Sequence, residues 1–419
     1  MDIQTLCQVI DDRKQELFEL LGSLIRINSE NSGTYGNELP CGEYVLQLCK
    51  ELGLDSVMYS PLDLEGFTQG PDYFPGRHLE NRVNVTARWN GKENCDRLMM
   101  MAHLDTVMIG DPANWDKDPL SGEISDGKIF GRGACDDKYA LAVSLFLIRI
   151  LKDAGFVPQK NVVFNAYCDE ELGGSHGAMA AVMRDPCEII LSMDGKQGQI
   201  WHCASGGQVV TYRYRVRGGA DSAEKTAKAF PVVMAELAAF GERRREELQN
   251  NPYYANTIIP ETSLRYNEIR AGNNDMDKDI GVLQFTFYTD KPKEVIWEEL
   301  TQMDAVLAKK LDTMGIDSEG FTPQTRFFHY GVCDPDSENI AALVDAAREA
   351  TGEELQVCGS CLSDLSVILK YGSKESFGFG CGRDFSMPGG AHQSNEYIAC
   401  DALVNYTKQV AAYLLRTVG

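Results

Sequence analysis

Acidic and imidazole side chains directly follow three apolar segments that we expect to be buried strands. The strands and the residues after them are Leu98–Ala102 with His103 and Asp105, Asn161–Tyr167 with Asp169, Glu170 and Glu171, and Ile189–Met193 with Asp194. In an open α/β sheet, ligands bind at the carboxyl ends of the strands. We therefore expect the three clusters to converge on one crevice, although they are far apart in the sequence.

Each of these residues also has an ordinary structural explanation when it is taken alone. A histidine at a strand end is often a hydrogen-bonded structural residue, adjacent glutamates are often solvated, and Asp194 before a glycine is typical of a turn. Asp136, in a fourth cluster with Asp137, is also explained as the N-cap of a helix that begins there. Carboxylates gathered at one cleft repel one another unless a cation or a proton compensates their charge. The combination therefore predicts a bound metal.

The alternation of strands and helices around these clusters predicts the fold class. The strand Leu98–Ala102 is followed by a predicted helix, Asp137–Asp153, and by the strand Asn161–Tyr167. Fully apolar strands are typical of a parallel sheet that helices cover on both faces. We therefore expect an α/β protein whose main domain has a mainly parallel sheet flanked by helices.

The segment after about Gly207 has a different pattern. Its expected elements are a strand at Gln208–Arg217 that alternates as an exposed strand does, a helix from Ala223 to about Leu248, a strand at Gly281–Tyr288 and a helix at Val295–Leu311. We interpret this segment as a small α+β insertion. The main domain is then expected to span residues 1–207 and 322–419, and the insertion residues 208–321.

The composition excludes several classes of protein. Of 419 residues, 43% are apolar and 24% charged, as in ordinary folded proteins. The net charge of −22 argues against a nucleic-acid partner, because that interaction needs a basic face. No apolar stretch approaches the ~20 residues of a membrane span, and the N-terminus shows no secretory signal. We therefore expect a cytoplasmic protein with no membrane partner, whose 13 scattered cysteines are reduced.

Six stretches, in this order along the chain, resemble the M20 metallopeptidases, a family that includes acetylornithine deacetylases, succinyl-diaminopimelate desuccinylases, aminoacylases and glutamate carboxypeptidases. The stretches are Met101–Val107, Gly131–Lys138, Asp169–Gly174, Met193–Gly195, Gly359–Asp364 and Ala391–Tyr397. The resemblance covers nearly the whole chain and implies hydrolysis of an amide or peptide bond in a small substrate, such as an N-acyl amino acid (a deacylase activity) or a dipeptide. It also implies that the insertion is a lid of the type that mediates dimerisation. The Gln208–Arg217 strand is then the expected edge for a homodimer.

The resemblance further implies roles for individual residues. By position, five residues would hold two metal ions: His103 and Asp194 on one, Glu171 and His392 on the other, and Asp136 bridging both. Asp105 would orient the imidazole of His103. Glu170 would be the general base, which takes a proton from water and passes it to the leaving amine. Two histidines and three carboxylates suit zinc, with manganese or cobalt as alternatives.

Two departures from the family pattern affect the lid. Members usually carry a lid histidine that helps to stabilise the oxyanion, and the corresponding stretch, Gly218–Ser222, contains none. An arginine usually found on a later lid strand is also missing from Phe285–Asp290. Losing one oxyanion donor lowers rates by about two to three orders of magnitude. Four residues are alternatives for oxyanion or substrate-carboxylate binding, although structural or solvated roles explain them more simply: His202, His329, Arg265 and Arg270.

Two other functions remain as hypotheses. Gly173–Gly177 fits the G-x-S-x-G pattern of serine hydrolases, with Ser175 as nucleophile. That pattern requires the serine on a turn directly after a strand, and here the Asp169–Gly174 stretch intervenes. The other hypothesis is a catalytically impaired M20-like scaffold that acts as a ligand-binding or regulatory protein. The missing lid histidine favours this hypothesis, whereas the retention of five ligand types and Glu170 opposes it.

Overall fold

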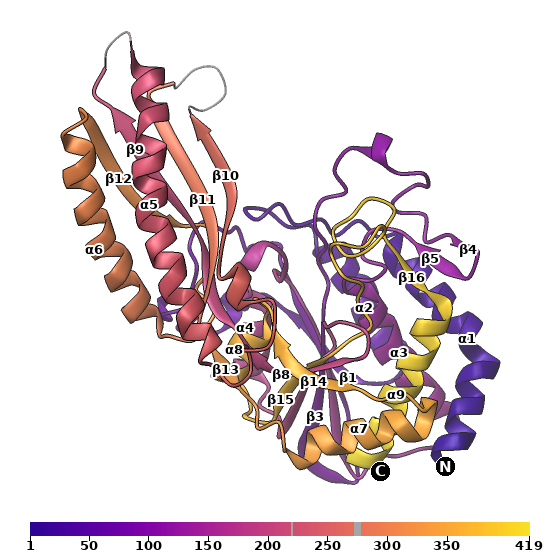
Figure 1. Ribbon diagram of the computed structural model, residues 1–419. Helices are drawn as coiled ribbons and strands as arrows, with labels where there is room; N and C mark the ends of the chain where they lie inside the picture. The colour runs from indigo at the N-terminus through magenta and orange to yellow at the C-terminus, as the bar shows by residue number, and fades with distance from the viewer. Residues whose placement is uncertain (219–220, 272–277) are drawn as a thin grey trace. The chain divides into compact units, whose positions relative to one another are not determined.

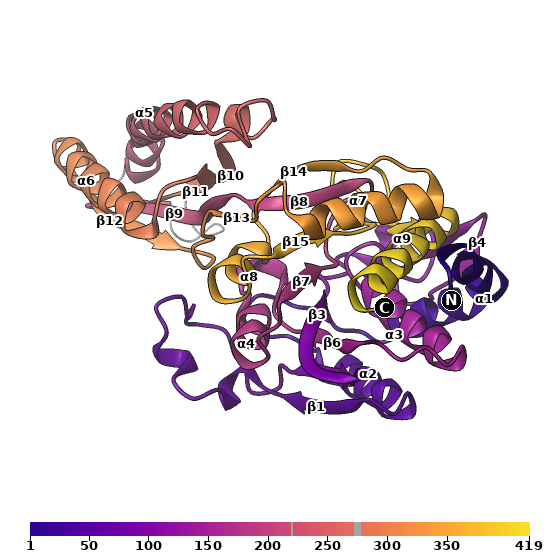
Figure 2. The same cartoon turned by 90° about the horizontal axis from the view of Figure 1, so that it is seen from below.

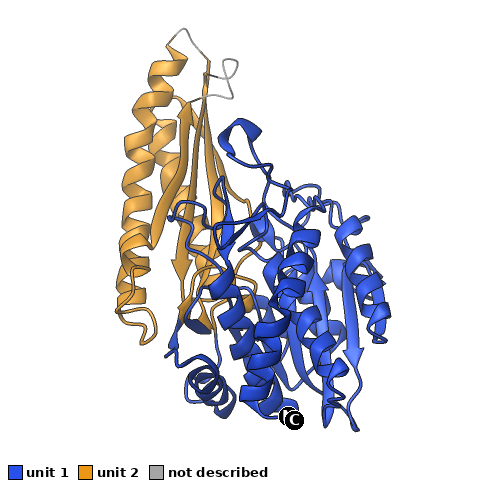
Figure 3. Cartoon of the chain, turned by 90° about the vertical axis from the view of Figure 1, so that its right-hand side faces the viewer, with its two compact units in different colours: residues 1–202, 332–358, 367–419 blue, residues 203–331, 359–366 orange. Residues whose placement is uncertain are grey.

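The computed structural model describes residues 1–218, 221–271 and 278–419, and the chain separates into two compact units (Figure 3). Unit 1 comprises Met1–His202, Val332–Cys358 and Val367–Gly419, and unit 2 comprises Cys203–Gly331 and Gly359–Ser366. The assignment of catalytic and lid roles to these units stays a prediction. None of the described helices has the length and apolar character needed to cross a membrane.

Unit 1 is built on a mixed sheet whose centre is parallel. The strand order is β1-β2-β6-β3-β7-β15-β8-β13, with β14 beside β8. Strand β13 spans Gly331–Val332, and β14 spans Gln356–Ser360. The parallel strands are β6 (Lys160–Tyr167), β3 (Glu93–His103), β7 (Ile189–Ser192) and β15 (Ser376–Phe379). Antiparallel strands flank them: β1 (Asp55–Tyr59), β2 (Asn84–Trp89) and β8 (Gln199–Ala204). The expected α/β fold with a central, mostly parallel sheet is confirmed.

Helices cover both faces of this sheet (Figures 1 and 2). On one face lie α1 (Ile3–Ile25), α3 (Lys138–Asp153), α7 (Glu338–Thr351) and α9 (Cys400–Val418), with α3 and α9 against β3. On the other face lie α4 (His176–Arg184) and α8 (Leu365–Tyr371), which pack on Met99 and Met101 of β3. Residues Leu98 to Ala102 are fully buried, because successive side chains of β3 meet helices on opposite faces. Helix α2 (Leu39–Glu51) packs against β1 and β2.

A second, three-stranded sheet in unit 1 brings the C-terminal part of the chain to Asp136. Its strands are β16 (Tyr397–Ala399), β5 (Lys128–Phe130) and β4 (Ile124–Ser125), in this order. Just before β16, the Glu396 carboxylate accepts hydrogen bonds from Arg132 Nη1 (2.6 Å) and from the Cys135 backbone N–H (2.9 Å). These contacts hold the segment with His392 beside the segment with Asp136. The sequence did not predict this sheet, because strands of two or three residues show no measurable periodicity.

Unit 2 contains an antiparallel sheet and two long helices. The strand order is β10 (Leu264–Ala271), β11 (Ile280–Thr289), β9 (Gly206–Val216) and β12 (Ile316–Pro323). The helices α5 (Ser222–Gln249) and α6 (Lys293–Asp312) share one apolar core with the sheet. The predicted strand and helix ranges in this segment agree with these bounds to within a few residues.

The expectation that Gln208–Arg217 forms an exposed edge strand is wrong. Strand β9 pairs with β11 on one side and β12 on the other, which leaves β10 and β12 as the edges among the described strands. Tyr212 and Tyr214 are buried in the core, whereas Arg213 and Arg215 alternate with them and are half-buried. The alternation therefore indicates the two faces of the strand. It does not indicate whether the backbone groups on either side are paired.

Candidate metal centre

Asp136 lies between two histidines from distant parts of unit 1. Its Oδ1 is 3.0 Å from Nε2 of His103, and its Oδ2 is 3.2 Å from Nε2 of His392. One carboxylate oxygen therefore faces each imidazole, an arrangement that suits a carboxylate shared by two cations. The N-cap of α3 is Asp137, so the alternative interpretation of Asp136 as the helix cap is wrong.

His103 is the last residue of β3 and is fully buried. Its Nδ1–H donates to the backbone carbonyl of Asp105 (2.8 Å), so Nε2 is the ring nitrogen that faces Asp136. The sequence-based expectation was that the Asp105 carboxylate orients the ring. The structure differs, because that carboxylate is 3.8 Å from Nδ1 and the backbone carbonyl makes the hydrogen bond.

The Asp105 carboxylate holds the pair of glutamates. Its Oδ1 accepts from the backbone N–H of Glu170 (3.1 Å) and its Oδ2 from that of Glu171 (3.0 Å). Oδ2 also accepts from Nδ2 of the buried Asn31 (2.7 Å). Asp105 therefore ties the end of β3 to the backbone that presents both glutamates. Sequence reasoning missed Asn31, because a polar residue in a loop gives no signal that it faces a buried carboxylate.

Glu171 belongs to both groups of candidate metal ligands. We call the two groups together the metal-binding cluster: His103, Asp136, Glu170, Glu171 and His392. Its Oε2 is 2.9 Å from Nε2 of His392, and its Oε1 accepts from the Val107 N–H (3.1 Å). Among the described residues, two groups have ligand atoms that all lie within 4.8 Å of one another: His103, Glu170 and Glu171, and Asp136, Glu171 and His392. This set of imidazole and carboxylate donors fits divalent cations of the zinc type.

Asp194 follows β7 and belongs to neither of these groups. The end of β7 is fixed by Tyr139, whose hydroxyl donates to the Met193 carbonyl (2.7 Å) and accepts from the Cys381 N–H (2.9 Å). Burial raises the pKa of Asp137, and the charge of Asp194 adds to this effect. Asp194 therefore interacts with the residue next to Asp136, and its role as a ligand beside His103 stays a prediction.

The charges in the cluster depend on one another. Burial alone would lower the pKa of His392, but Glu171 and Asp136 raise it to about 11. Burial alone would raise the pKa of Asp136, but hydrogen bonds with His103 and His392 hold it below its usual range. Burial and the charge of Asp136 raise the pKa of Glu171. The carboxylates of the cluster therefore favour a positive charge beside them, and either protonated histidines or a bound divalent cation would supply it.

Other residues singled out from the sequence have different surroundings. Ser175 is fully buried at the N-terminus of α4, which argues against a serine nucleophile. His202 donates from Nδ1 to the Cys333 carbonyl (3.0 Å), and the ring of His329 packs on Phe327. The stretch expected to hold a lid histidine, Gly218–Ser222, includes residues 219–220, which lie outside the described residues.

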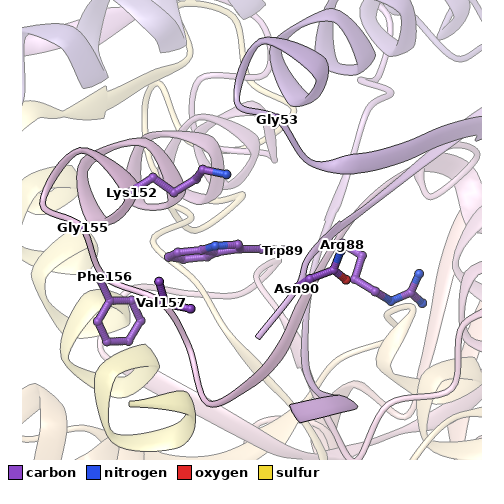
Figure 4. A pocket seen from close by; sticks show the side chains of 8 residues that line it. All are labelled: Gly53, Arg88, Trp89, Asn90, Lys152, Gly155, Phe156 and Val157. Carbon is purple, nitrogen blue, oxygen red and sulfur yellow. The ribbon is translucent and has the colours of Figure 1, made fainter. Parts of the chain in front are cut away.

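A cavity of about 310 Å³ lies elsewhere in unit 1 (Figure 4). Trp89, Phe156 and the stem of Lys152 face it, and none of the candidate ligands is among its lining residues. The cavity is therefore not part of the candidate metal site.

Comparison with known proteins gives an independent result. Residues 99–416 match the family described as peptidase family M20/M25/M40. An uncharacterized metallohydrolase of Methanocaldococcus jannaschii is 22% identical over 94% of this chain and 97% of its own length. The putative dipeptidase YtjP of Bacillus subtilis is 33% identical over 38% of this chain and 31% of its own length. Several curated relatives are matched over less than half of their length.

Solved structures show the same fold. Human carnosine dipeptidase 1 superimposes with a TM-score of 0.73 at 15% identity, over 99% of this chain and 98% of its own. A Bacillus subtilis protein described as a dinuclear metal-binding peptidase of the M20 family superimposes with a TM-score of 0.56 at 14% identity, over 97% of this chain and 100% of its own.

Proposed function

The chain belongs to peptidase family M20/M25/M40, and from this we propose that it is a metal-dependent hydrolase of an amide or peptide bond in a small substrate, a dipeptide or an N-acyl amino acid. The observation that carries the proposal is the position of Asp136 between His103 and His392. The dipeptidase among its relatives and the carnosine dipeptidase fold support the substrate class.

We assign two divalent ions to the cluster, most simply zinc, with manganese or cobalt as alternatives. The residues that would hold them are His103, Asp136, Glu171, His392 and, as expected from the sequence, Asp194. Bound ions of this kind polarise a carbonyl and lower the pKa of water, so that hydroxide is available near neutral pH. The dinuclear peptidase with the same fold supports the number of ions.

Glu170 is the proposed general base. It is half-buried, whereas Glu171 is buried with its two oxygens against His392 and Val107. Asp105 holds the backbone of Glu170 in place. The Glu170 carboxylate would take a proton from water at one oxygen and give it to the nitrogen of the leaving amine. This role requires that Glu170 is not used as a ligand, although it is grouped with His103 and Glu171.

The test is amine release from a panel of N-acyl amino acids and dipeptides by the wild type, Glu170→Gln and Glu43→Gln. Glu43 is exposed on α2 and serves as the matched control. We expect Glu170→Gln to lose about 10²–10⁴-fold in turnover while it keeps its metal, and the control to match the wild type. Equal turnover in Glu170→Gln and the wild type removes Glu170 as the base.

A ligand-binding or regulatory protein is the second candidate, favoured by the lack of a histidine in Gly218–Ser222. Metal content and the same panel separate the two candidates. Bound metal without release of amine from any member of the panel would support the binding protein, and metal-dependent release would exclude it.

A further inference from the structure

The turn that carries Glu170 and Glu171 has an unusual backbone. It connects β6 to α4 and includes a short 3₁₀ helix, Glu171–Gly173. Asp169, Leu172 and Ser175 have positive φ angles of 62°, 60° and 58°. Residues with a Cβ adopt such angles rarely, and only where surrounding contacts hold them. The positions of the two glutamates therefore depend on whatever holds this turn.

Arg77 makes several of the contacts that hold the turn, in addition to those of Asp105 and Asn31. Its side chain is only 4% exposed. Nη1 donates to Oδ1 of Asp169 (2.6 Å) and to the backbone carbonyl of Glu171 (3.4 Å), and Nη2 donates to the carbonyl of Leu172 (2.5 Å). One planar guanidinium thus bridges the start of the turn and two carbonyls in its middle, which a lysine ammonium cannot do with the same geometry.

Asp169 is in turn fixed by groups around it. Its Oδ1 also lies 2.7 Å from Nη1 of Arg82, and its Oδ2 accepts from Nδ1 of His176 (2.6 Å). Nε2 of His176 accepts from the Phe74 N–H (3.2 Å), which sets the Nδ1–H tautomer that Asp169 needs. Arg82 itself donates from Nε to Glu38 (2.7 Å). These side chains are buried, so each contact is protected from water.

Arg77 differs from Arg82 in what it contacts. Arg82 interacts with the carboxylates of Glu38 and Asp169, whereas Arg77 also donates to main-chain carbonyls of the turn. A buried ion pair contributes little net stability compared with an apolar replacement. We therefore expect the Arg77 contacts to affect the conformation of the turn more than the stability of the whole protein.

We propose that Arg77 is a positioning residue, which fixes the turn at residues 169–175 so that Glu170 and Glu171 face the metal-binding cluster. The proposal rests on the proposed function and extends it to a residue outside the proposed metal ligands and general base. Groups that orient metal ligands commonly change metal affinity or activity by about 10–100-fold when they are replaced. Small displacements of a reacting group have effects of a similar size.

The experiment compares Arg77→Lys with Arg88→Lys. Arg88 on β2 forms a bidentate pair with Asp96 on β3 (2.9 and 2.7 Å). Neither residue belongs to the turn, so Arg88→Lys controls for the loss of a bidentate arginine elsewhere in unit 1. For both variants we would measure thermal unfolding of the metal-free protein, cobalt(II) affinity by competition with a chelator, and kcat and KM on the best substrate of the panel.

We expect Arg77→Lys to lose about 10–100-fold in cobalt(II) affinity and in kcat, with KM within about twofold, while Arg88→Lys matches the wild type in all three. The same affinity and kcat in Arg77→Lys as in Arg88→Lys would overturn the proposal. Should Arg77→Lys not fold, Arg77→Gln, which keeps an amide donor without the charge, undergoes the same measurements. Cobalt(II) affinity does not depend on turnover, so failure of the hydrolase assignment would leave this readout decisive for Arg77.

Discussion

Oδ2 of Asp136 and Nε2 of His392 lie 3.2 Å apart, although the two residues belong to different segments of unit 1, Met1–His202 and Val367–Gly419. The pairing of β5 with β16 and the hydrogen bonds of Glu396 bring them together. The geometry of the proposed ligand set therefore depends on the three-stranded sheet β16-β5-β4 as well as on the ligand residues themselves.

Glu396→Gln is therefore expected to weaken metal binding without removing a ligand. The neutral amide makes a weaker pair with Arg132 than the carboxylate does, and one buried donor loses its charged partner. We expect about tenfold lower cobalt(II) affinity, measured by competition with a chelator. Unchanged affinity in Glu396→Gln, with Glu43→Gln as the control, would show that the His392 segment is held by other contacts.

Asp194→Asn tests the one expected ligand that lies outside both groups of ligand atoms. If Asp194 holds one ion with His103, elemental analysis of the purified variant should find one metal ion per chain in place of two, because an amide is a much weaker ligand than a carboxylate. Two ions in the variant would instead assign the ligand position beside His103 to Glu170 or Glu171, and only the first of these would require another general base.

Removal of metal should lower the stability of the protein. A ligand that binds only the folded state stabilises it by about 2.7 kcal/mol when its free concentration is 100 times Kd, and here the cation also relieves repulsion among buried carboxylates. We expect a chelator to lower Tm and added zinc to restore it. In Asp136→Asn the chelator should have little effect; an equal loss of Tm in that variant would place the stabilising ion elsewhere.

His202 should make stability depend on pH below neutrality. Burial lowers its pKa from the ordinary 6.5, so the unfolded chain binds the proton more tightly than the folded chain. The contribution of neutral His202 is therefore present above pH 6.5 and is lost as the pH falls below it. Denaturant unfolding between about pH 5 and 7 should show a shallower loss of stability in His202→Gln than in the wild type. The same slope in both proteins would contradict this assignment.

The sequence was sufficient for the elements that rely on strong local patterns. The apolar run Leu98–Ala102 and the carboxyl ends of β3 and β6 predicted that His103, Glu170 and Glu171 lie on one edge of the sheet, and the structure brings these three residues together. Gln208–Arg217 shows the limit, since period-two alternation identified a strand but not its position within the sheet.

The contacts that orient the site were not predictable in the same way. Arg77 lies in a segment without helix or strand and reaches Asp169 across a long sequence separation. For Asp105, the spacing to His103 indicated proximity but not which atom faces the ring, and the backbone carbonyl proved to be the partner. Such details depend on loop conformation, which local sequence patterns do not specify.

The most direct measurement is the metal content of the wild type and Asp136→Asn after saturation with zinc and removal of free ion, with circular dichroism as a check that both are folded. We predict two zinc ions per wild-type chain and a loss of both from the variant, because in the proposed site each histidine would share its ion with one oxygen of Asp136. Two zinc ions retained in folded Asp136→Asn would contradict the account.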